Sequence, residues 1–178
     1  MTNLAATLMA FFWGTSCAHG ALNQSQLEVV PSVDINRYLG TWFEIARYPN
    51  SFQGDCFAST ATYSLRGDGN IKVINRCNEG SFDGPIDEAV GKAWVVDPST
   101  NAKLKVQFFW PFAGNYWIID LDPNYQWAVV GEPDRQYLWI LSRTPQMDKN
   151  DYEGIISRLT PKGYDPQELI ITPQKETL

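Results

Sequence analysis

Histidine is almost absent from this chain of 178 residues, in which the single one is His19, close to the N-terminus. The rest of the chain therefore has no imidazole for a catalytic triad, for general base catalysis, or for binding haem or a metal ion. Charge is also scarce, since Asp, Glu, Lys and Arg make up 19% of the residues and the net charge is -6. Nucleic acids need clustered Lys and Arg, so a nucleic-acid partner is not expected. We predict no enzyme activity, no metal and no cofactor.

Long hydrophobic runs are lacking as well. The apolar run at the N-terminus, residues 4–13, is too short to span a bilayer and is followed by small residues. We predict that residues 1–20 are a signal peptide. The Gly-Thr-Ser-Cys sequence that ends at Cys17 resembles a bacterial lipoprotein box, in which this Cys becomes the lipidated first residue. The alternatives are cleavage after Gly20, which leaves a soluble protein, and a buried core helix. Residues 21–32 are polar and are expected to be a linker.

Cysteine is limited to three residues, and either route of signal processing removes the first of them from the pool of free thiols. The remaining pair, Cys56 and Cys77, is expected to form a disulfide, as in other exported proteins. A turn at 67–70 would align Cys77 with a residue three positions beyond Cys56, which is farther than a disulfide reaches. The bond therefore requires the chain to curl or bulge near Gly54. Without such a bulge, both thiols would be free.

Aromatic residues are abundant, at 13% of the chain, so much ring surface must be buried or must line a cavity. After the linker, short apolar-alternating runs are separated by Gly, Pro, Asn and Asp, which is typical of an antiparallel barrel. From residue 103 onward the alternation is strict, and Leu104, Val106 and Phe108 share one apolar face. Eight strands are predicted at 40–47, 57–65, 71–77, 89–96, 103–109, 116–121, 127–130 and 137–142.

One amphipathic helix is predicted near the C-terminus. It begins near Asn150, a good N-cap, with Glu153 three residues later. Its apolar stripe consists of Tyr152, Ile155, Ile156 and Leu159. Pro161 and Gly163 end the helix, and residues 169–171 form a closing strand at the edge of the barrel. The predicted fold is therefore all-β, an eight-stranded antiparallel barrel with one C-terminal α-helix packed outside.

Two segments resemble a known family. Residues 33–39 fit a short helical turn, and Gly40 and Trp42 follow it in a Gly-x-Trp pattern that resembles the first-strand signature of the lipocalin family. Residues 133–145 resemble the second and third signatures and are most similar to those of bacterial lipocalins and their apolipoprotein D-like relatives. The resemblance covers nearly all of the chain after the linker. It implies an up-and-down lipocalin barrel over residues 33–174.

The resemblance places a structural signature, Gly40, Trp42 and Arg143, at the closed end of the barrel. A guanidinium laid across an indole gains about 0.5–2 kcal/mol and would plug the base. The alternative for Trp42 is an ordinary core aromatic. If Arg143 points inward, strand alternation directs Leu141 and Trp139 inward as well.

Ligand contacts are expected from inward-facing side chains. The strictly alternating strand supplies apolar lining, and the resemblance adds two polar groups at positions similar to those in the cavity of the apolipoprotein D-like branch. The predicted ligand-binding residues are Tyr63, Asn75, Leu104, Val106, Phe108, Trp117 and Trp139. For Tyr63, Asn75, Trp117 and Trp139 the alternative is plain core or surface packing.

The open mouth of such a barrel would be formed by loops near 48–56, 80–85 and 110–112. Phe52, Trp110 and Phe112 would carry aromatic surface there. Such an entrance would meet a membrane or a second copy of the protein in a homodimer. The alternative is that these loops cover their own aromatic rings.

The resemblance implies a protein that binds, stores or transports a hydrophobic ligand, a fatty acid or a lysophospholipid, in the bacterial cell envelope. A lipidated Cys17 would anchor it in the outer membrane facing the periplasm; otherwise it would be a soluble periplasmic or secreted protein. Two other functions stay open. One is a thiol-dependent isomerase of the lipocalin type, which needs a free and inward-facing Cys77. The other is a barrel filled with side chains that serves as a structural or interaction module.

Overall fold

The computed structural model describes residues 26–176. The predicted signal peptide and Cys17 lie outside the described residues, as do residues 21–25 of the predicted linker. The strands and helices, in chain order, are α1 (Ile35–Tyr38), β1 (Gly40–Arg47), β2 (Cys56–Leu65), β3 (Ile71–Glu79), β4 (Ile86–Val95), β5 (Lys103–Phe109), β6 (Phe112–Leu121), β7 (Trp127–Gly131), β8 (Leu138–Ser142), α2 (Lys149–Leu159), the 3-10 turns η1 (Thr160–Lys162) and η2 (Pro166–Glu168), and β9 (Ile170–Ile171).

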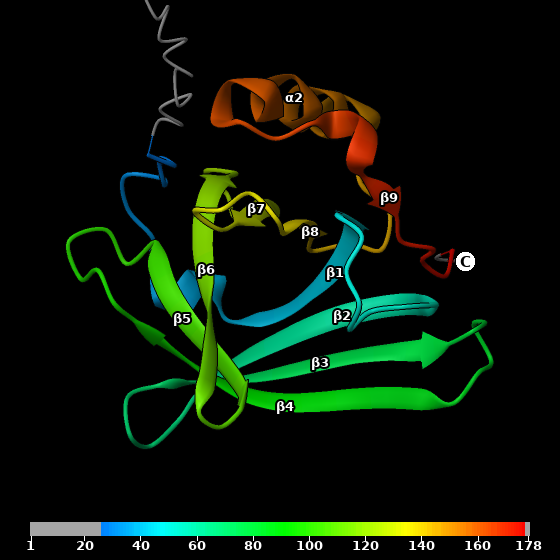
Figure 1. Ribbon diagram of the computed structural model, residues 1–178, viewed down its shortest axis with the longest axis horizontal. Helices are drawn as coiled ribbons and strands as arrows, with labels where there is room; N and C mark the ends of the chain where they lie inside the picture. The colour runs from blue at the N-terminus through cyan, green and yellow to red at the C-terminus, as the bar shows by residue number, and fades with distance from the viewer. Residues whose placement is uncertain (1–25, 177–178) are drawn as a thin grey trace, which may run out of the picture.

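Strands β1 to β8 form a closed antiparallel barrel, as predicted. Each strand from β1 to β7 pairs with the next along the chain, and β8 pairs with β1 to close the barrel. Figure 1 shows the barrel with α2 lying outside it, over β7 and β8. Neighbouring strands are joined by short connections, so the arrangement is up-and-down.

Two strands begin three or more residues before their predicted starts, since β4 begins at Ile86 and β6 begins at Phe112. At the start of β6, Gly114 and Asn115 pair with Val106 and Lys105 of β5. These residues favour turns in isolation, and ladder hydrogen bonding to the neighbouring strand overrides that local preference.

Helix α2 begins at Lys149, and its N-cap is Asp148, so the prediction of Asn150 as the cap is wrong. The Asp148 carboxylate accepts hydrogen bonds from the backbone N–H groups of Asn150, at 2.8 Å, and Asp151, at 3.4 Å. Asp and Asn are equally good caps, so the local sequence allowed either start. The predicted apolar stripe is confirmed, since Ile155 and Leu159 are buried.

The core consists of two apolar clusters, separated by the barrel wall. The inner cluster lies inside the barrel and includes Trp42, Tyr63, Val73, Leu104, Ile118, Val130 and Leu141. The outer cluster joins the barrel to α2 and includes Ile45, Ile119, Val129, Ile140, Ile155 and Leu159. Successive residues along β6 and β7 alternate between the two clusters, as strand geometry requires.

The described part of the predicted linker is packed against the barrel. Leu27 is only 2% exposed and belongs to the outer cluster. The backbone N–H of Val30 donates to the carbonyl of Ile118, at 3.0 Å. The segment was predicted to be a polar linker, but its apolar residues cover the barrel wall.

The C-terminal segment fills a gap between β1 and β2. These strands pair only over the first half of β1, whereas the second half pairs with β9, where Ala46 lies opposite Ile171. Beyond β9, the carbonyl of Pro173 accepts from the N–H of Ala58, at 2.8 Å. The Gln174 amide donates to carbonyls on both sides, those of Glu44 at 2.8 Å and Ser59 at 2.9 Å. The closing strand is therefore confirmed, and it completes the barrel wall toward the open end.

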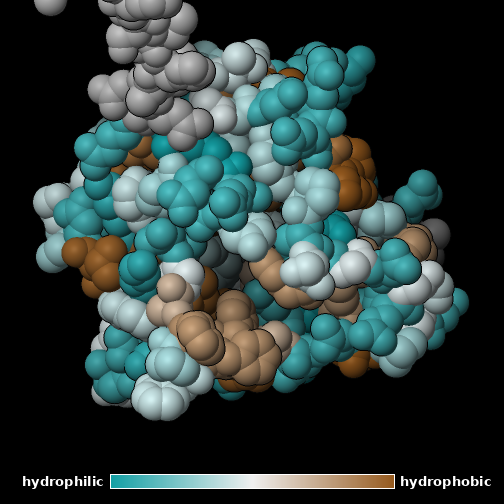
Figure 2. Space-filling model, in the orientation of Figure 1, coloured by the Kyte–Doolittle hydropathy of each residue, from teal (hydrophilic) through white to brown (hydrophobic). Residues whose placement is uncertain are grey.

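The connection between β5 and β6 exposes large hydrophobic side chains. Trp110 is 86% exposed and Phe112 is 78% exposed. Figure 2 shows a group of hydrophobic side chains over this connection, at the lower centre of the view. The other connections at this end of the barrel are β1–β2, β3–β4 and β7–β8, and together these four form its mouth.

Candidate functional site in the barrel interior

The closed end of the barrel is plugged by Trp42 and Arg143, as predicted. Trp42 is fully buried, and the guanidinium carbon of Arg143 lies 3.7 Å from the centroid of its ring. The guanidinium also donates to the carbonyls of Arg37, at 2.7 Å, and Thr41, at 3.0 Å. The Trp42 indole donates to the carbonyl of Tyr38, at 2.8 Å. Every polar group of the plug therefore has a partner, and its role is structural.

Gly40 is required by the geometry of this plug. Its φ of +94° lies in the left-handed region that favours glycine, and a Cβ atom there would stand 3.3 Å from Nη1 of Arg143. A larger residue would both strain the backbone and displace the guanidinium. The Gly-x-Trp pattern thus has a direct physical cause.

Above the plug, three tyrosine hydroxyls meet inside the barrel. The hydroxyl of Tyr116 lies 2.8 Å from that of Tyr38 and 2.8 Å from that of Tyr63. Burial raises the pKa of Tyr63 to about 12, and it raises the pKa values of Tyr38 and Tyr116 well above 10. The cluster is therefore neutral at physiological pH. Three hydroxyl protons serve two hydrogen bonds within it, so one donor is left for an acceptor on a ligand.

Tyr63 was predicted as an inward-facing residue, but Tyr38 and Tyr116 were not. Tyr38 belongs to α1, which lies across the closed end, and only the tertiary fold brings it to Tyr63. Tyr116 is the inward neighbour of Trp117, and a shift of the β6 alternation by one residue would have found it.

Trp117 faces the other side of the wall. Its ring packs in the outer cluster near α2, with the ammonium of Lys103 4.6 Å from its centroid. The prediction that Trp117 lines the cavity is therefore wrong. Residues 116–119 are all apolar, so sequence alternation could not decide which of them point inward.

The predicted apolar lining does face the interior. Leu104 is buried in the inner cluster, and Val106, Phe108 and Trp139 pack against that cluster while staying partly exposed. The inward face of β5 is thus buried at Leu104, near the closed end, and partly exposed at Val106 and Phe108, nearer the mouth. Opposite Phe108, a Cβ atom on Gly91 would lie 2.8 Å from the phenyl ring, so only glycine fits beside it.

Asn75 lies on the inward face of β3, level with Ala61 on one side and Ala89 on the other. Its Oδ1 atom is buried and has no hydrogen-bond partner among the described residues. An unpaired buried carbonyl oxygen costs about 1–3 kcal/mol. The Oδ1 atom of Asn75, which lies between two small residues, is therefore able to accept a hydrogen bond from a donor group on a ligand.

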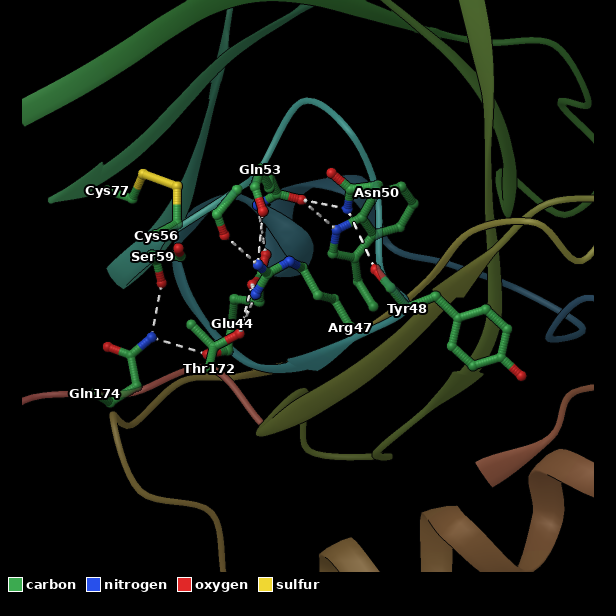
Figure 3. Close-up of polar contacts among 12 residues, drawn as sticks. Glu44, Arg47, Tyr48, Asn50, Gln53, Cys56, Ser59, Cys77, Thr172 and Gln174 are labelled. Carbon is green, nitrogen blue, oxygen red and sulfur yellow. Dashed lines mark hydrogen bonds and ion pairs between the residues drawn. A yellow bond between two sulfur atoms is a disulfide. The ribbon is translucent and has the colours of Figure 1, made fainter. Parts of the chain in front are cut away.

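A buried ion pair lies closer to the mouth, and sequence analysis did not identify it (Figure 3). Nη1 of Arg47 lies 3.3 Å from Oε1 of Glu44, and both side chains are 6% exposed. The hydroxyl of Thr172, from the C-terminal segment, donates to the same Oε1 at 2.6 Å. Both charged residues belong to β1, and a bulge between Glu44 and Ala46 lets both point inward.

The β1–β2 loop is fastened onto this ion pair. Nη2 of Arg47 donates to the carbonyls of Gln53, at 2.7 Å, and Gly54, at 3.0 Å. The side-chain amide of Gln53 donates to Oε2 of Glu44, at 2.8 Å, and its oxygen accepts from the indole of Trp139, at 3.0 Å. A loop from the mouth thus places an amide group inside the barrel.

Cys56 and Cys77 form a disulfide with their Cα atoms 5.4 Å apart. The predicted misalignment of the two cysteines is confirmed. Thr60 pairs with Arg76, and this register would place Cys77 opposite Ser59, three residues beyond Cys56. A bulge after Phe57 closes the gap, with Ala58 in the left-handed conformation at φ 52°. The bulge was expected near Gly54 and lies in β2 instead. A free Cys77 thiol, which the isomerase alternative needs, is not present in this state.

The mouth is aromatic and acidic. Phe52 is 60% exposed, and Trp110 and Phe112 are more exposed still, so the loops do not cover these three rings. The ring of Phe52 also lies 5.5 Å from that of Tyr137. Beside the disulfide lies a recess of about 430 Å³. It is lined by Phe52, Gly54, Asp55, Cys56, Glu79, Gly80, Pro85 and Asp87.

No helix within residues 26–176 is both long enough and apolar enough to cross a membrane. Over the same range, no three His, Cys, Asp or Glu side chains are grouped so that they could hold a metal ion.

Comparison with known proteins agrees with this geometry. Residues 33–174 match the model of the lipocalin-like domain. Temperature-induced lipocalin-1 of Arabidopsis thaliana is 41% identical over 163 residues, which cover 86% of each chain. The outer membrane lipoprotein Blc of Escherichia coli K12 is 40% identical over 171 residues, which cover 96% of each chain. Bovine apolipoprotein D is 32% identical, over 96% of this chain and 88% of its own.

Solved structures support the same fold at lower sequence identity. Insecticyanin from the tobacco hornworm Manduca sexta superposes with a TM-score of 0.66 at 20% identity, covering 84% of this chain and 85% of its own. The barrel, the Gly-x-Trp signature with its arginine partner and the match over residues 33–174 lead to one conclusion: the chain belongs to the lipocalin family.

Proposed function

We propose that the protein binds, stores or transports a lipid with a long acyl chain, a fatty acid or a lysophospholipid, inside the barrel. The observation that carries this proposal is the row of inward-facing apolar side chains on β5, which is buried near the base and becomes more exposed toward the mouth. Such a gradient is typical of a cup that is open at one end.

In this proposal the acyl chain lies among Leu104, Val106, Phe108 and Trp139. The head group stays toward the mouth, where the loss of hydration costs least. Tyr63 and Asn75 offer a spare hydroxyl donor and an unpaired acceptor deeper in the barrel. These contacts are part of the proposal.

We further propose that the protein works in the bacterial cell envelope, where a lipidated Cys17 would anchor it in the outer membrane facing the periplasm. Several relatives at about 40% identity are named outer membrane lipoproteins, which supports this location. Cleavage after Gly20 would instead give a soluble periplasmic or secreted protein. Mass spectrometry of the mature N-terminus distinguishes the two. The exposed aromatic mouth would then face the membrane, and a homodimer through it would appear as concentration-dependent association.

Binding is proposed rather than catalysis. The residues that line the interior carry aromatic, aliphatic and neutral hydroxyl groups, and both described cysteines are joined in a disulfide. The inward ion pair of Glu44 and Arg47 is engaged in its own hydrogen bonds.

Titration with fatty acids and lysophospholipids of increasing chain length tests the proposal. Each further methylene should add up to about 0.8 kcal/mol of binding free energy until the cavity is full. Trp139→Glu should sharply weaken binding, because it places an unpaired carboxylate among apolar groups. Trp110→Glu, at an 86% exposed position of the mouth, is the matched control and should bind with nearly unchanged affinity.

Circular dichroism serves as the folding control for both variants. Affinity that does not depend on chain length, or that is unchanged in a folded Trp139→Glu protein, would contradict the proposal. In that case the barrel is filled with side chains, or the ligand binds elsewhere.

A further inference from the structure

The tip of the β5–β6 hairpin carries exposed aromatic side chains on one side of the mouth. We infer that Phe109, Trp110 and Phe112, together with Val90 of β4, dock on a phospholipid bilayer by inserting the hairpin tip among the lipid head groups. These four residues are called the hairpin patch. The inference rests on the proposed function, because it assumes that the ligand is a membrane lipid that is exchanged through the mouth.

The side chains of the hairpin patch are exposed to solvent although they are large and apolar. Phe109 is 77% exposed and Val90 is 51% exposed, and the two other rings are at least as exposed as that of Phe109. Single exposed apolar residues are common on soluble proteins, whereas a group of them marks an interaction site. The hydrophobic group over the β5–β6 connection is visible in Figure 2.

Strand register makes the hairpin patch continuous across three strands. Lys92 of β4 pairs with Gln107 of β5. Two residues further toward the mouth, the same antiparallel register places Val90 beside Phe109. Phe109 in turn pairs with Phe112 of β6. The exposed apolar residues of β4, β5 and β6 therefore lie next to one another, although they are far apart in the chain.

The composition and shape of the hairpin suit a lipid surface. Residues 106–119 contain no charged side chain, so the tip can leave water without the cost of burying an ion. Aromatic rings are favoured at the boundary between head groups and acyl chains. A tip whose rings are more than three-quarters exposed protrudes from the barrel. Fluid lipid can close around a protruding tip, whereas a protein partner would need a matching cavity.

Two lysines lie behind the hairpin patch on the outer wall of the barrel. Strand alternation directs Lys105 outward, because Leu104 and Val106 face the interior. Lys92 points outward as well, since its neighbour Ala93 belongs to the inner cluster. At about 3.3 Å per residue, the two lysines stand about 7 and 13 Å behind the patch along their strands. Their long side chains can therefore reach lipid phosphates while the tip lies deeper.

The acidic residues of the mouth lie on another side. Asp55, Glu79 and Asp87 line the recess between the β1–β2 and β3–β4 connections. Glu88 of β4 forms an ion pair with Arg76. In Figure 1 the β5–β6 connection lies at the bottom of the view and α2 at the top, so the helix does not obstruct the hairpin. Docking through the hairpin keeps the carboxylates of the recess away from lipid phosphates.

A second copy of the chain fits the hairpin patch less well than a bilayer does. Three aromatic rings of about 150–250 Å² each offer less than the roughly 800 Å² that each partner contributes to a standard protein interface. If the tip entered the acidic recess of another copy, the carboxylates there would lose water without gaining a partner. A bilayer meets neither obstacle.

Fluorescence quenching by vesicles tests the inference on the mature protein. Phosphatidylcholine vesicles with brominated acyl chains quench an indole that reaches the acyl-chain boundary. The parent protein should be quenched, and Trp110→Phe should lose most of the quenching, because it keeps an aromatic ring at the tip but removes the inserted indole. A lipid anchor on Cys17 would be common to the parent and the variants, and it places no indole in the bilayer.

Variants assign insertion to the hairpin patch. Phe109→Asp should lower the equilibrium constant for insertion of Trp110 by about tenfold or more, because it removes a ring and adds a charge at the tip. The matched control is Leu65→Asp, at a 55% exposed position next to the closed end, which should change nothing. Replacement of Lys92 or Lys105 by Gln should weaken insertion about fivefold on vesicles with about 30% phosphatidylglycerol. Circular dichroism is the folding control.

Equal quenching of the parent and Trp110→Phe, or equal insertion of folded Phe109→Asp and Leu65→Asp proteins, would overturn the inference. Sedimentation that shows a dimer lost in Phe109→Asp, without quenching by vesicles, would overturn it too and assign the hairpin patch to a second copy.

Ligand titration in solution separates this inference from the proposed function. Phe109→Asp should bind free fatty acids with the affinity of the parent, since Phe109 lies at the exposed tip. Chain-length-dependent binding without insertion of Trp110 would overturn the docking inference alone. Insertion of Trp110 without any binding of fatty acids or lysophospholipids would support the docking surface and contradict the proposed function.

Discussion

At the closed end of the barrel, Arg143 lies over Trp42 and each of its guanidinium nitrogens donates to a backbone carbonyl. At the open end, Arg47 is equally an inward-facing arginine, but its Nε has no partner among the described residues. Its Nη1 donates to Glu44 and Thr172, and only its Nη2 donates to the carbonyls of a loop. Arg143 thus completes the packing of the closed end, whereas Arg47 holds together the polar groups of the candidate site.

The same contrast holds for the remaining buried polar atoms. Among the described residues, the buried side-chain atoms without a partner are Arg47 Nε, Asn50 Oδ1, Ser59 Oγ and Asn75 Oδ1. None of them lies at the closed end. Natural proteins pair nearly all buried polar groups, so the concentration of these atoms on β1, the following loop, β2 and β3 distinguishes this region from the closed end.

Removal of the closed-end plug should have the largest effect. Trp42→Ala should lower the free energy of unfolding by about 3–5 kcal/mol, the range for losing a large buried aromatic side chain. Chemical denaturation measures it. Trp110→Ala, which removes the same ring at the exposed mouth, is the control and should change stability by no more than about 0.5 kcal/mol. A Trp42→Ala protein as stable as the parent would show that the closed end depends no more on its tryptophan ring than the mouth does.

The open end should depend on its disulfide. The bond links residues 21 positions apart, and the loss of this constraint on the unfolded chain should cost about 3 kcal/mol in a Cys56→Ala, Cys77→Ala protein. Alkylation without reductant, followed by mass analysis, should leave Cys56 and Cys77 of the parent unmodified. Complete alkylation would revive the thiol-enzyme alternative and would mean that the open end is held by hydrogen bonds alone.

A smaller effect is expected from the tyrosine cluster between the two ends. Burial raises the pKa of Tyr63 from 10.0 to about 12, so the hydroxyl stays protonated in the folded protein at a pH where the unfolded chain ionises. Its contribution to stability is complete below pH 10 and is lost as the pH rises toward 12, at about 1.4 kcal/mol per pH unit. Denaturant titrations across this range should give a shallower decline for Tyr63→Phe. Identical slopes would mean that water reaches the cluster.

Several features of the protein were predictable because their signals are local. The strict alternation from Leu104 to Phe108 identifies β5 and its inward face, and the same periodicity identifies the apolar stripe of α2. The Gly-x-Trp pattern indicates the family and, with it, the plug. The pairing of Cys56 with Cys77 follows from counting cysteines, although the bulge that permits it does not.

Other features required the fold. Residues 116–119 are uniformly apolar, so their sequence carries no alternation, and only their pairing with β5 and β7 sends Tyr116 inward and Trp117 outward. Bulges have the same consequence elsewhere. One in β1 turns both Glu44 and Arg47 toward the interior, and nothing in the local sequence predicts it.

By itself, the sequence determined which segments are strands, which helix face is apolar, how the base is plugged and which cysteines pair. The first two depend on residue periodicity, the third on a short motif that resembles a family signature, and the last on the number of cysteines. Only the tertiary structure decided what lies at the open end. Gln53, from a loop, and Thr172, from the C-terminal segment, bind Glu44 and Arg47, and Trp139 of β8 donates to Gln53. Glu44 and Thr172 are far apart in the chain, and closure of the barrel brings them together. Local sequence patterns cannot predict such contacts, because they depend only on residues that are close in the chain.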